Sequence, residues 1–261
     1  MKNLLIIPLA IAGIMLCSFQ PVDKPAYSVK KIVIDAGHGG FDPGCSGSIS
    51  KEKELTLEIA FELGKLISTF HKDVEIIYTR TKNQYVNLHE RAMIANRASA
   101  DLFISIHCNA YPKENIHGTE TYTMGLSHTN DNLAVAMREN SVILKEEGYL
   151  QLYDGFDPKS PVSYILLSNL QQAYQENSIA FASLIENEFG KANERPNRGV
   201  KQAGFLVLAK TTMPSVLVEV GFLTNKEEEK YLNSDLGKAK VAANLYRAFR
   251  NYKRDLEARS N

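Results

Sequence analysis

Residues 31–44 read KIVIDAGHGGFDPG. The run Lys31–Asp35 is short and largely apolar, and the glycine-rich AGHGG follows directly, which predicts a strand that feeds a loop. Glycines on both sides of His38 let the backbone approach a ligand closely and have no packing role of their own. We therefore expect His38 to project from a loop at the end of a strand.

Helical and strand patterns then alternate along the chain. Leu55, Ile59, Leu63, Leu66 and Ile67 recur at helical spacing, so residues 52–70 are predicted to form an amphipathic helix. The remaining elements are predicted as strands at 74–79, 102–106, 119–124, 205–208 and 215–220, and as helices at 86–99 and from about 226 onward. This order predicts a single α/β domain: a largely parallel twisted sheet flanked by helices on both faces.

A long helical stretch interrupts this alternation between about residues 130 and 189. The turn-rich segment DGFDPKSP at residues 154–161 breaks it. We interpret residues 130–174 as a helical insertion in a catalytic domain that spans residues 30–256.

Composition limits the partners of the chain. Of its 261 residues 44% are hydrophobic, and 30 basic side chains balance 30 acidic ones. Zero formal charge without a block of like charge indicates neither nucleic acid nor an anionic membrane as partner. Recognition of a substrate must therefore be local.

The N-terminus has the pattern of an export signal. Lys2 precedes an apolar run from Leu4 to Leu16 that is too short to span a bilayer comfortably, so residues 1–19 are predicted to be a signal peptide and residues 20–29 a linker. Cys17 raises the alternative of a lipoprotein, but Leu16 stands where a small residue is typical, so cleavage is favoured. Once the leader is removed, no membrane span is expected.

Four polar side chains fall at or near predicted strand ends and helix starts. His38 follows the first strand, Glu52 opens the first helix, His107 ends LFISI and Glu219 ends SVLV. In a parallel sheet, ligands bind at the carboxyl ends of the strands, where residues far apart in sequence meet. Two imidazoles and one carboxylate make a three-ligand set that suits catalytic zinc, with one position left for water.

The second carboxylate would serve as general base and acid. Zinc lowers the pKa of bound water to about 7, and a carboxylate outside the ligand set can take the proton and return it to a departing amine. From the residues alone, Glu52 and Glu219 fill these two roles in either order.

At these residues the sequence resembles the Amidase_3 type of zinc-dependent N-acetylmuramoyl-L-alanine amidases. The resemblance runs from Lys31 to about Tyr252 and rests on four ordered motifs: IDAGHGGFDPG, EKELTLEIA, SIHCNA and VEVGFLTN. Asn83, where Asp is frequent, and Cys108, where Ala is usual, depart from the pattern without touching a ligand position.

The resemblance implies a function and a role for each residue. His38, Glu52 and His107 would bind one Zn²⁺ per chain, and Glu219 would be the general base and acid. The reaction would be hydrolysis, by zinc-activated water, of the amide between N-acetylmuramic acid and L-alanine of the stem peptide, in wall remodelling and daughter-cell separation. The substrate would be peptidoglycan.

Some division-associated members of that family place a helix over the zinc until an activator protein displaces it. By that resemblance, residues 133–150 (LAVAMRENSVILKEEGYL) would be a regulatory lid, with Glu146 or Glu147 reaching the metal. An ordinary packed helix pair is the alternative interpretation.

Two other functions compete with the amidase. One is a catalytically idle wall-binding or activator protein on the same fold, which loss of a ligand or of Glu219 would indicate; all four residues are present. The other is a zinc peptidase of wall peptides, which product analysis would distinguish. We expect the protein to be exported and to reside in the periplasm.

Overall fold

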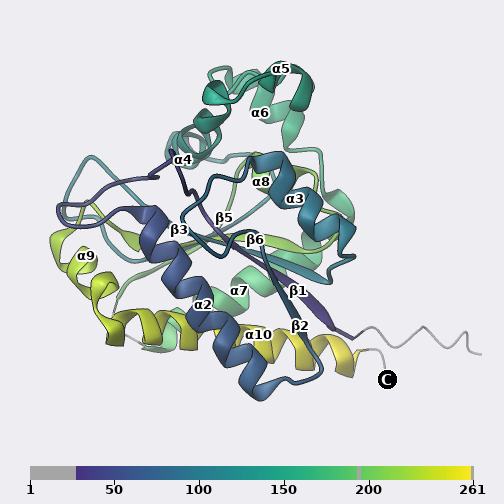
Figure 1. The fold of residues 1–261 in the computed structure, drawn as a ribbon, viewed down its shortest axis with the longest axis vertical. Coiled ribbons are helices and arrows are strands. Elements are labelled where there is room, and N and C mark those ends of the chain that lie inside the picture. The colour runs from purple at the N-terminus through teal and green to yellow at the C-terminus, as the bar shows by residue number, and fades with distance from the viewer. Residues whose placement is uncertain (1–27, 193–194, 260–261) are drawn as a thin grey trace, which may run out of the picture.

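The computed structural model describes residues 28–192 and 195–259, which form a three-layer α/β fold (Figure 1). The predicted leader, Cys17 and most of the predicted linker lie outside the described residues. In the described part of the chain, no helix is both long and apolar enough to cross a membrane.

A six-stranded sheet forms the middle layer, in the order β2-β1-β3-β6-β4-β5. All neighbouring pairs are parallel except β4–β6, which is antiparallel. The strands are β1 (Lys31–Ala36), β2 (Glu75–Tyr78), β3 (Leu102–Asn109), β4 (Thr119–Thr123), β5 (Asn197–Gln202) and β6 (Ser215–Phe222). The predicted fold class is confirmed, with the sheet mixed at this one pair.

Three long helices cover one face of the sheet: α2 (Glu52–Phe70), α7 (Gln175–Ala192) and α10 (Asp235–Ala258), the last preceded by α9 (Lys226–Asn233) (Figure 1). The helix predicted over residues 52–70 is confirmed at both ends. Its apolar positions Leu55, Ile59 and Leu63 are buried against alternate residues of β3, such as Ile104 and Ile106. This helical layer and the sheet enclose the larger of the two cores.

Shorter helices cover the opposite face. They are α3 (Leu88–Arg97), α8 (Leu206–Ala209) and the insertion, which comprises α4 (Asn130–Asn140), the 3-10 turn η1 (Ser141–Lys145), α5 (Tyr149–Leu152), α6 (Pro161–Leu167) and the 3-10 turn η2 (Gln172–Tyr174). Phe103, Tyr122 and Leu217 project from the sheet into this second core, where Phe205 and Ile143 meet them. The insertion, with α5 and α6, rises above this face (Figure 1).

Two elements differ from the sequence prediction. Residues 205–208 were expected to be a strand, but residues 206–209 form α8, in which all four side chains are buried. A short, uniformly apolar run does not distinguish a strand from a helix that is buried on all sides. The predicted set also lacked β5, whose sequence NRGVKQ is polar because it is an edge strand with partly exposed side chains.

Candidate metal centre and active site

Parallel pairing of β3 with β6 brings two of the predicted residues side by side. His107 and Glu219 are register partners in this pair, and both are buried. Their side chains share the sheet face that carries Leu217 and the second core, because residues alternate along a strand. The site thus begins with an imidazole and a carboxylate on adjacent strands.

His38 reaches the same place from the loop after β1. The loop crosses toward β3, where the Gly37 amide donates to the Ile106 carbonyl at 3.0 Å. His38 has a left-handed φ of 61°, which is uncommon for a residue other than glycine and marks a functional constraint. Asp42 Oδ2 lies 2.7 Å from His38 Nδ1 and orients the ring, which leaves Nε2 facing the cluster. A carboxylate behind a ligating imidazole is the usual way to fix the ring's tautomer.

Glu52, at the start of α2, is fully buried and held by two backbone amides. Its Oε2 accepts from the Cys45 amide at 2.7 Å and its Oε1 from the Cys108 amide at 2.8 Å. Oε1 also lies 3.0 Å from His107 Nδ1 and 3.0 Å from His38 Nε2. The structure therefore brings His38, Glu52 and His107 together, as the sequence predicted.

A fourth side chain joins them from the insertion. Glu139, in the last turn of α4, places Oε2 at 3.2 Å from His38 Nε2 and 3.3 Å from His107 Nδ1. Candidate ligand atoms of His38, Glu52, His107 and Glu139 all lie within 4.8 Å of one another. These four residues are called the metal group below. Two nitrogens and two carboxylate oxygens gathered so closely make a donor set of the kind zinc takes in a tetrahedral site.

The polar atoms of this group fit a cation between them. His38 Nε2 and Glu139 Oε2 are buried and have no hydrogen-bond partner, although each has neighbours at close range. Burial lowers the pKa of His107, but the adjacent carboxylates of Glu139 and Glu52 outweigh this effect and raise the pKa to about 9. The carboxylates thus make the centre of the group strongly favourable for positive charge.

Glu219 lies beside this group and outside it. Its Oε1 is 3.5 Å from Arg138 Nη2, and its buried Oε2 has no hydrogen-bond partner. Burial raises the pKa of Glu219 well above its usual range, and the charge of Glu139 raises it further. A buried carboxyl next to a metal group, with one free oxygen, is suited to hold and transfer a proton.

The family profile described as N-acetylmuramoyl-L-alanine amidase, Amidase_3, matches residues 32–251. The chain belongs to this family. It is 29% identical to the amidase AmiA of Escherichia coli K12 over 224 residues, and this alignment covers 85% of the chain and 76% of AmiA. It is 28% identical over 224 residues to AmiC of Escherichia coli O6:H1, again over 85% of this chain; it spans 52% of AmiC, about half of that protein's length.

Solved structures of amidases have the same fold. An N-acetylmuramoyl-L-alanine amidase of Clostridium difficile 630 aligns with a TM-score of 0.65 at 25% identity, covering 87% of this chain and 97% of that one. The catalytic domain of the amidase CwlV from Bacillus (Paenibacillus) polymyxa aligns with a TM-score of 0.63 at 27% identity, covering 85% and 97%. The single-domain mixed sheet flanked by helices is therefore the architecture of these amidases.

Neither Glu146 nor Glu147, the alternative candidates from the insertion, lies in the metal group. Glu146 follows η1, and its carboxylate accepts from the hydroxyls of Tyr85 and, at 2.8 Å, Tyr153. Glu147 is exposed. The residue that enters the metal group is Glu139, one helical segment earlier, because α4 ends directly over the strand ends. Residues 133–150 thus place a carboxylate in the metal group, but it is that of Glu139.

Arg138, beside Glu139, was also missed. Its Nη2 lies 2.9 Å from Glu139 Oε1, and the guanidinium donates to Ala110 O at 3.1 Å and Asn109 Oδ1 at 3.0 Å. It thereby bridges the insertion to the end of β3. In the sequence, an adjacent Arg–Glu pair on a predicted helix reads as solvated surface, so no pattern singled it out.

Two buried arginines, likewise not predicted, hold the His38 loop. Arg80 donates to the carbonyls of Ala36 and Gly37, each at 2.8 Å. Arg91 donates to the His38 carbonyl at 2.7 Å and pairs with Asp35 at 2.8 Å. Burial would penalise these cations, and their several hydrogen bonds to fixed carbonyls offset it. They position His38 without touching the metal group.

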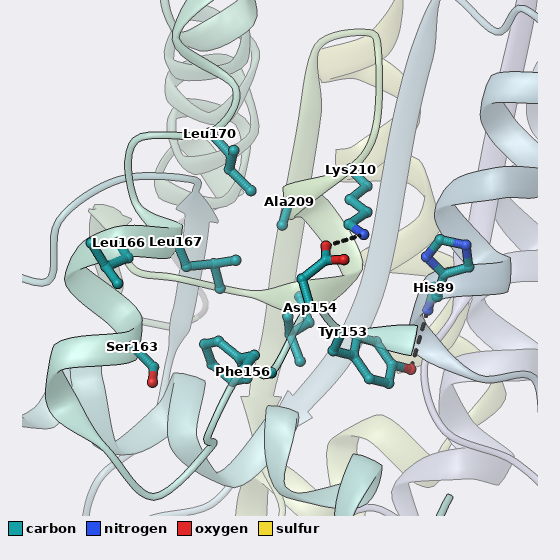
Figure 2. Close-up of a pocket in the computed structure, with 12 residues that line it drawn as sticks. His89, Tyr153, Asp154, Phe156, Ser163, Leu166, Leu167, Leu170, Ala209 and Lys210 are labelled. Atoms are coloured by element: carbon teal, nitrogen blue, oxygen red, sulfur yellow. Dashed lines mark hydrogen bonds and ion pairs between the residues drawn. The ribbon is translucent and has the colours of Figure 1, made fainter. Parts of the chain in front are cut away.

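A separate hollow of about 250 Å³ lies between the insertion and α8 (Figure 2). Leu166, Leu167 and Leu170 form one wall, and Tyr153 and the ion pair between Asp154 and Lys210 form the other. No member of the metal group lines it. This apolar hollow is therefore distinct from the candidate active site.

Proposed function

We propose that the chain is a zinc-dependent N-acetylmuramoyl-L-alanine amidase. It hydrolyses the amide between the lactyl group of N-acetylmuramic acid and the L-alanine that begins the stem peptide. The observation that carries this proposal is the placement of Glu219 directly beside, and outside, the ligand atoms of His38, Glu52 and His107. Metal chemistry and proton transfer are thereby assigned to separate groups on adjacent strands.

Two of the three proposed ligands, Glu52 and His38, are held in place by neighbouring groups. Both oxygens of Glu52 are fixed by backbone amides, and His38 is fixed by Asp42 on one side and by Arg91 through its carbonyl on the other. When bound, zinc supplies Lewis acidity at the scissile carbonyl and activates water. Two nitrogens and one carboxylate as permanent ligands leave one coordination position for the reaction.

Glu219 performs the proton transfers. Its unpartnered Oε2 takes a proton from the attacking water and then delivers it to the nitrogen of L-alanine, so that the C–N bond breaks with a neutral amine as leaving group. Burial keeps competing water away from this carboxyl.

The test is mass spectrometry of the soluble products after the purified mature chain is incubated with peptidoglycan, with and without zinc. Release of intact stem peptides with a free L-alanine amine, dependent on zinc and lost with a chelator, is the expected result. Shorter peptides cut within the stem would instead identify a zinc peptidase. Absence of any product from both the wild type and a Glu139→Ala variant, at full zinc loading, would indicate an idle wall-binding protein.

We propose further that the insertion is an autoinhibitory lid. Glu139 stands where the fourth coordination position is expected, so the arrangement with α4 in place excludes the substrate carbonyl. Asn140 anchors α4, since its amide donates to the Gly204 carbonyl and its oxygen accepts from the Leu206 amide. An activator protein that draws α4 away would open the site.

The setting that fits this chemistry is the cell envelope. The apolar N-terminal run predicts export, and peptidoglycan lies outside the cytoplasmic membrane, so we propose a periplasmic enzyme of wall remodelling and daughter-cell separation. Intact mass of the mature protein tests the leader: loss of Cys17 supports simple cleavage, and an acylated Cys17 would make it a lipoprotein.

A further inference from the structure

The edge of the sheet next to Glu219 contains an irregularity that places two cations on one side. Along the β4–β5 pair, Thr119 pairs with Asn197 but Thr121 pairs with Val200, so β5 has one extra residue. Residues three apart on a regular strand project to opposite faces. The bulge at Gly199 removes this opposition, and Arg198 and Lys201 both reach Oε1 of Glu120, at 2.7 Å and 2.5 Å.

The bulge depends on glycine for its backbone conformation. Gly199 has φ 84°, in the left-handed region, and nothing lies within 4 Å of the position a Cβ would take. A side chain would therefore have room here. Glycine is needed because of the left-handed backbone conformation that brings the two cations to one side.

Two cations on one carboxylate leave a surplus of positive charge. Glu120 is buried and saturated, because its second oxygen accepts from Tyr122 Oη at 2.8 Å and Asn109 Nδ2 at 3.1 Å. Arg198 uses only Nε for Glu120, and its Nη1 and Nη2 donate to no residue that the structure describes. The Arg198 side chain is 33% exposed and that of Lys201 20%, so both are open to a solute.

This surplus charge adjoins the reacting groups. Glu120 lies directly opposite Glu219 in the antiparallel β4–β6 pair. The Arg198 guanidinium lies over the ring of Phe222, three residues after Glu219 on β6, with 5.4 Å from its carbon to the ring centroid. Asn109 completes the link, since it contacts Glu120 on one side and Arg138, the partner of Glu219, on the other.

We propose that Arg198 and Lys201 form a carboxylate subsite for the stem peptide, an inference that rests on the proposed amidase function. In peptidoglycan the residue after L-alanine is D-glutamate, which continues the chain through its side chain and leaves its α-carboxylate free. The open Nη1 and Nη2 edge of Arg198 matches a carboxylate in a two-point, charge-assisted contact. Arg198 and Lys201 would then set the preference for anionic stems and hold the leaving amine near Glu219.

A purely structural role makes a different prediction. If the cations only neutralise Glu120, their loss will disturb the β4–β6 edge for every ligand equally. A subsite will instead distinguish two ligands that differ in a single charge. The probe is therefore a pair of stem tripeptides, one with the free α-carboxylate on its second residue and one with the primary amide there.

Isothermal titration of both tripeptides into the full mature chain tests this inference without requiring turnover. We expect the carboxylate form to bind about tenfold more tightly than the amide, as for a charge-assisted pair. Arg198→Gln is expected to remove this ratio while leaving amide binding within about twofold, and Arg198→Lys is expected to restore part of it. Lys201→Met is the second variant, in case Arg198→Gln does not fold by circular dichroism.

The control is Arg254→Gln on α10, whose side chain is 70% exposed and pairs with Asp255; its binding ratio is expected to equal that of the wild type. Equal binding of the two tripeptides to the wild type, or no detectable binding of either to both the wild type and the Glu139→Ala variant, would overturn the subsite. Failure of the amidase function is read separately, from peptidoglycan products. Cleavage without charge preference refutes only the subsite, and preference without cleavage by either the wild type or Glu139→Ala refutes only the amidase.

Discussion

His107 and Glu219 are direct register partners in the β3–β6 pair. One hydrogen-bonded ladder therefore fixes both a proposed metal ligand and the proposed proton carrier. A change of one residue in this register would turn one of the two side chains to the other face of the sheet. The spacing between His107 and Glu219 is thus a property of the sheet and does not depend on loop conformation.

Replacement of Glu219 by Gln keeps the shape and removes the proton carrier. We expect turnover to fall by about 10²–10⁴-fold, the usual contribution of general acid–base catalysis. Zinc content, measured by atomic emission, should stay at one per chain, because Glu219 lies outside the metal group. Turnover equal to that of the wild type would refute the assigned role, and loss of zinc would make Glu219 a ligand instead.

Replacement of Glu139 by Ala should open the site. If Glu139 blocks the fourth position, basal hydrolysis of peptidoglycan without any activator should rise at least about tenfold, equivalent to roughly 1.4 kcal/mol removed from the closed state. Glu147→Ala, an exposed change in the same insertion, is the matched control and should leave the rate unchanged. A lower rate and weaker zinc binding in Glu139→Ala would show a permanent ligand and contradict the lid.

Arg91 should be essential for stability, although it contacts no metal ligand side chain. Arg91→Lys cannot reproduce hydrogen bonds to Val86, Ala36 and His38 together with the ion pair to Asp35. Removing one partner of a buried pair costs about 3–5 kcal/mol. Arg91→Lys keeps the charge but loses several of these hydrogen bonds, so we expect a loss of up to this amount, measured by urea unfolding. Arg97→Lys, exposed on the same helix, should change stability by less than about 0.5 kcal/mol. A comparable loss in both variants would argue against positioning of the His38 loop.

Glu186 on α7 should make stability depend on pH. Burial raises its pKa to about 7, although hydroxyls of Thr121 and Thr119 donate to it. The folded state therefore retains a proton that the unfolded state releases near its ordinary pKa of 4.5. Between these two values the free energy of unfolding should fall as pH rises, by up to about 3 kcal/mol at roughly 1.4 kcal/mol per unit.

The measurement is chemical denaturation of wild type and Glu186→Gln from pH 5 to 8. The difference between the two curves isolates the contribution of Glu186. The free energy of unfolding of the variant should therefore fall less with rising pH than that of the wild type. Glu176→Gln, on the exposed first turn of the same helix, serves as control and should follow the wild type. Parallel curves for wild type and Glu186→Gln would refute the assignment.

The sequence predicted those parts of the molecule in which a pattern has a single physical meaning. The apolar spacing of Leu55, Ile59 and Leu63 defined α2, and polar residues at strand ends indicated that His38, Glu52 and His107 would meet. Glu139 could not be predicted, because its position depends on how an inserted segment folds back over the sheet. Nothing in its local sequence distinguishes it from Glu146 or Glu147.

The same limit explains the remaining differences. The run from Phe205 to Leu208 is apolar throughout, and its conformation as α8 follows from packing on every side. The strand β5 is polar, since it lies at the sheet edge, and its extra residue at Gly199 becomes visible only from its pairing with β4. Tertiary context decided each of these cases.

The proposed chemistry and the proposed restraint occupy separate parts of the gene. The three proposed permanent ligands and Glu219 come from the β1 loop, α2, β3 and β6, whereas Glu139 and Arg138 both belong to one uninterrupted stretch within residues 130–174. That stretch could be gained, lost or exchanged in one event without rewriting the catalytic residues. The proposed control is therefore free to evolve at a different pace from the proposed reaction.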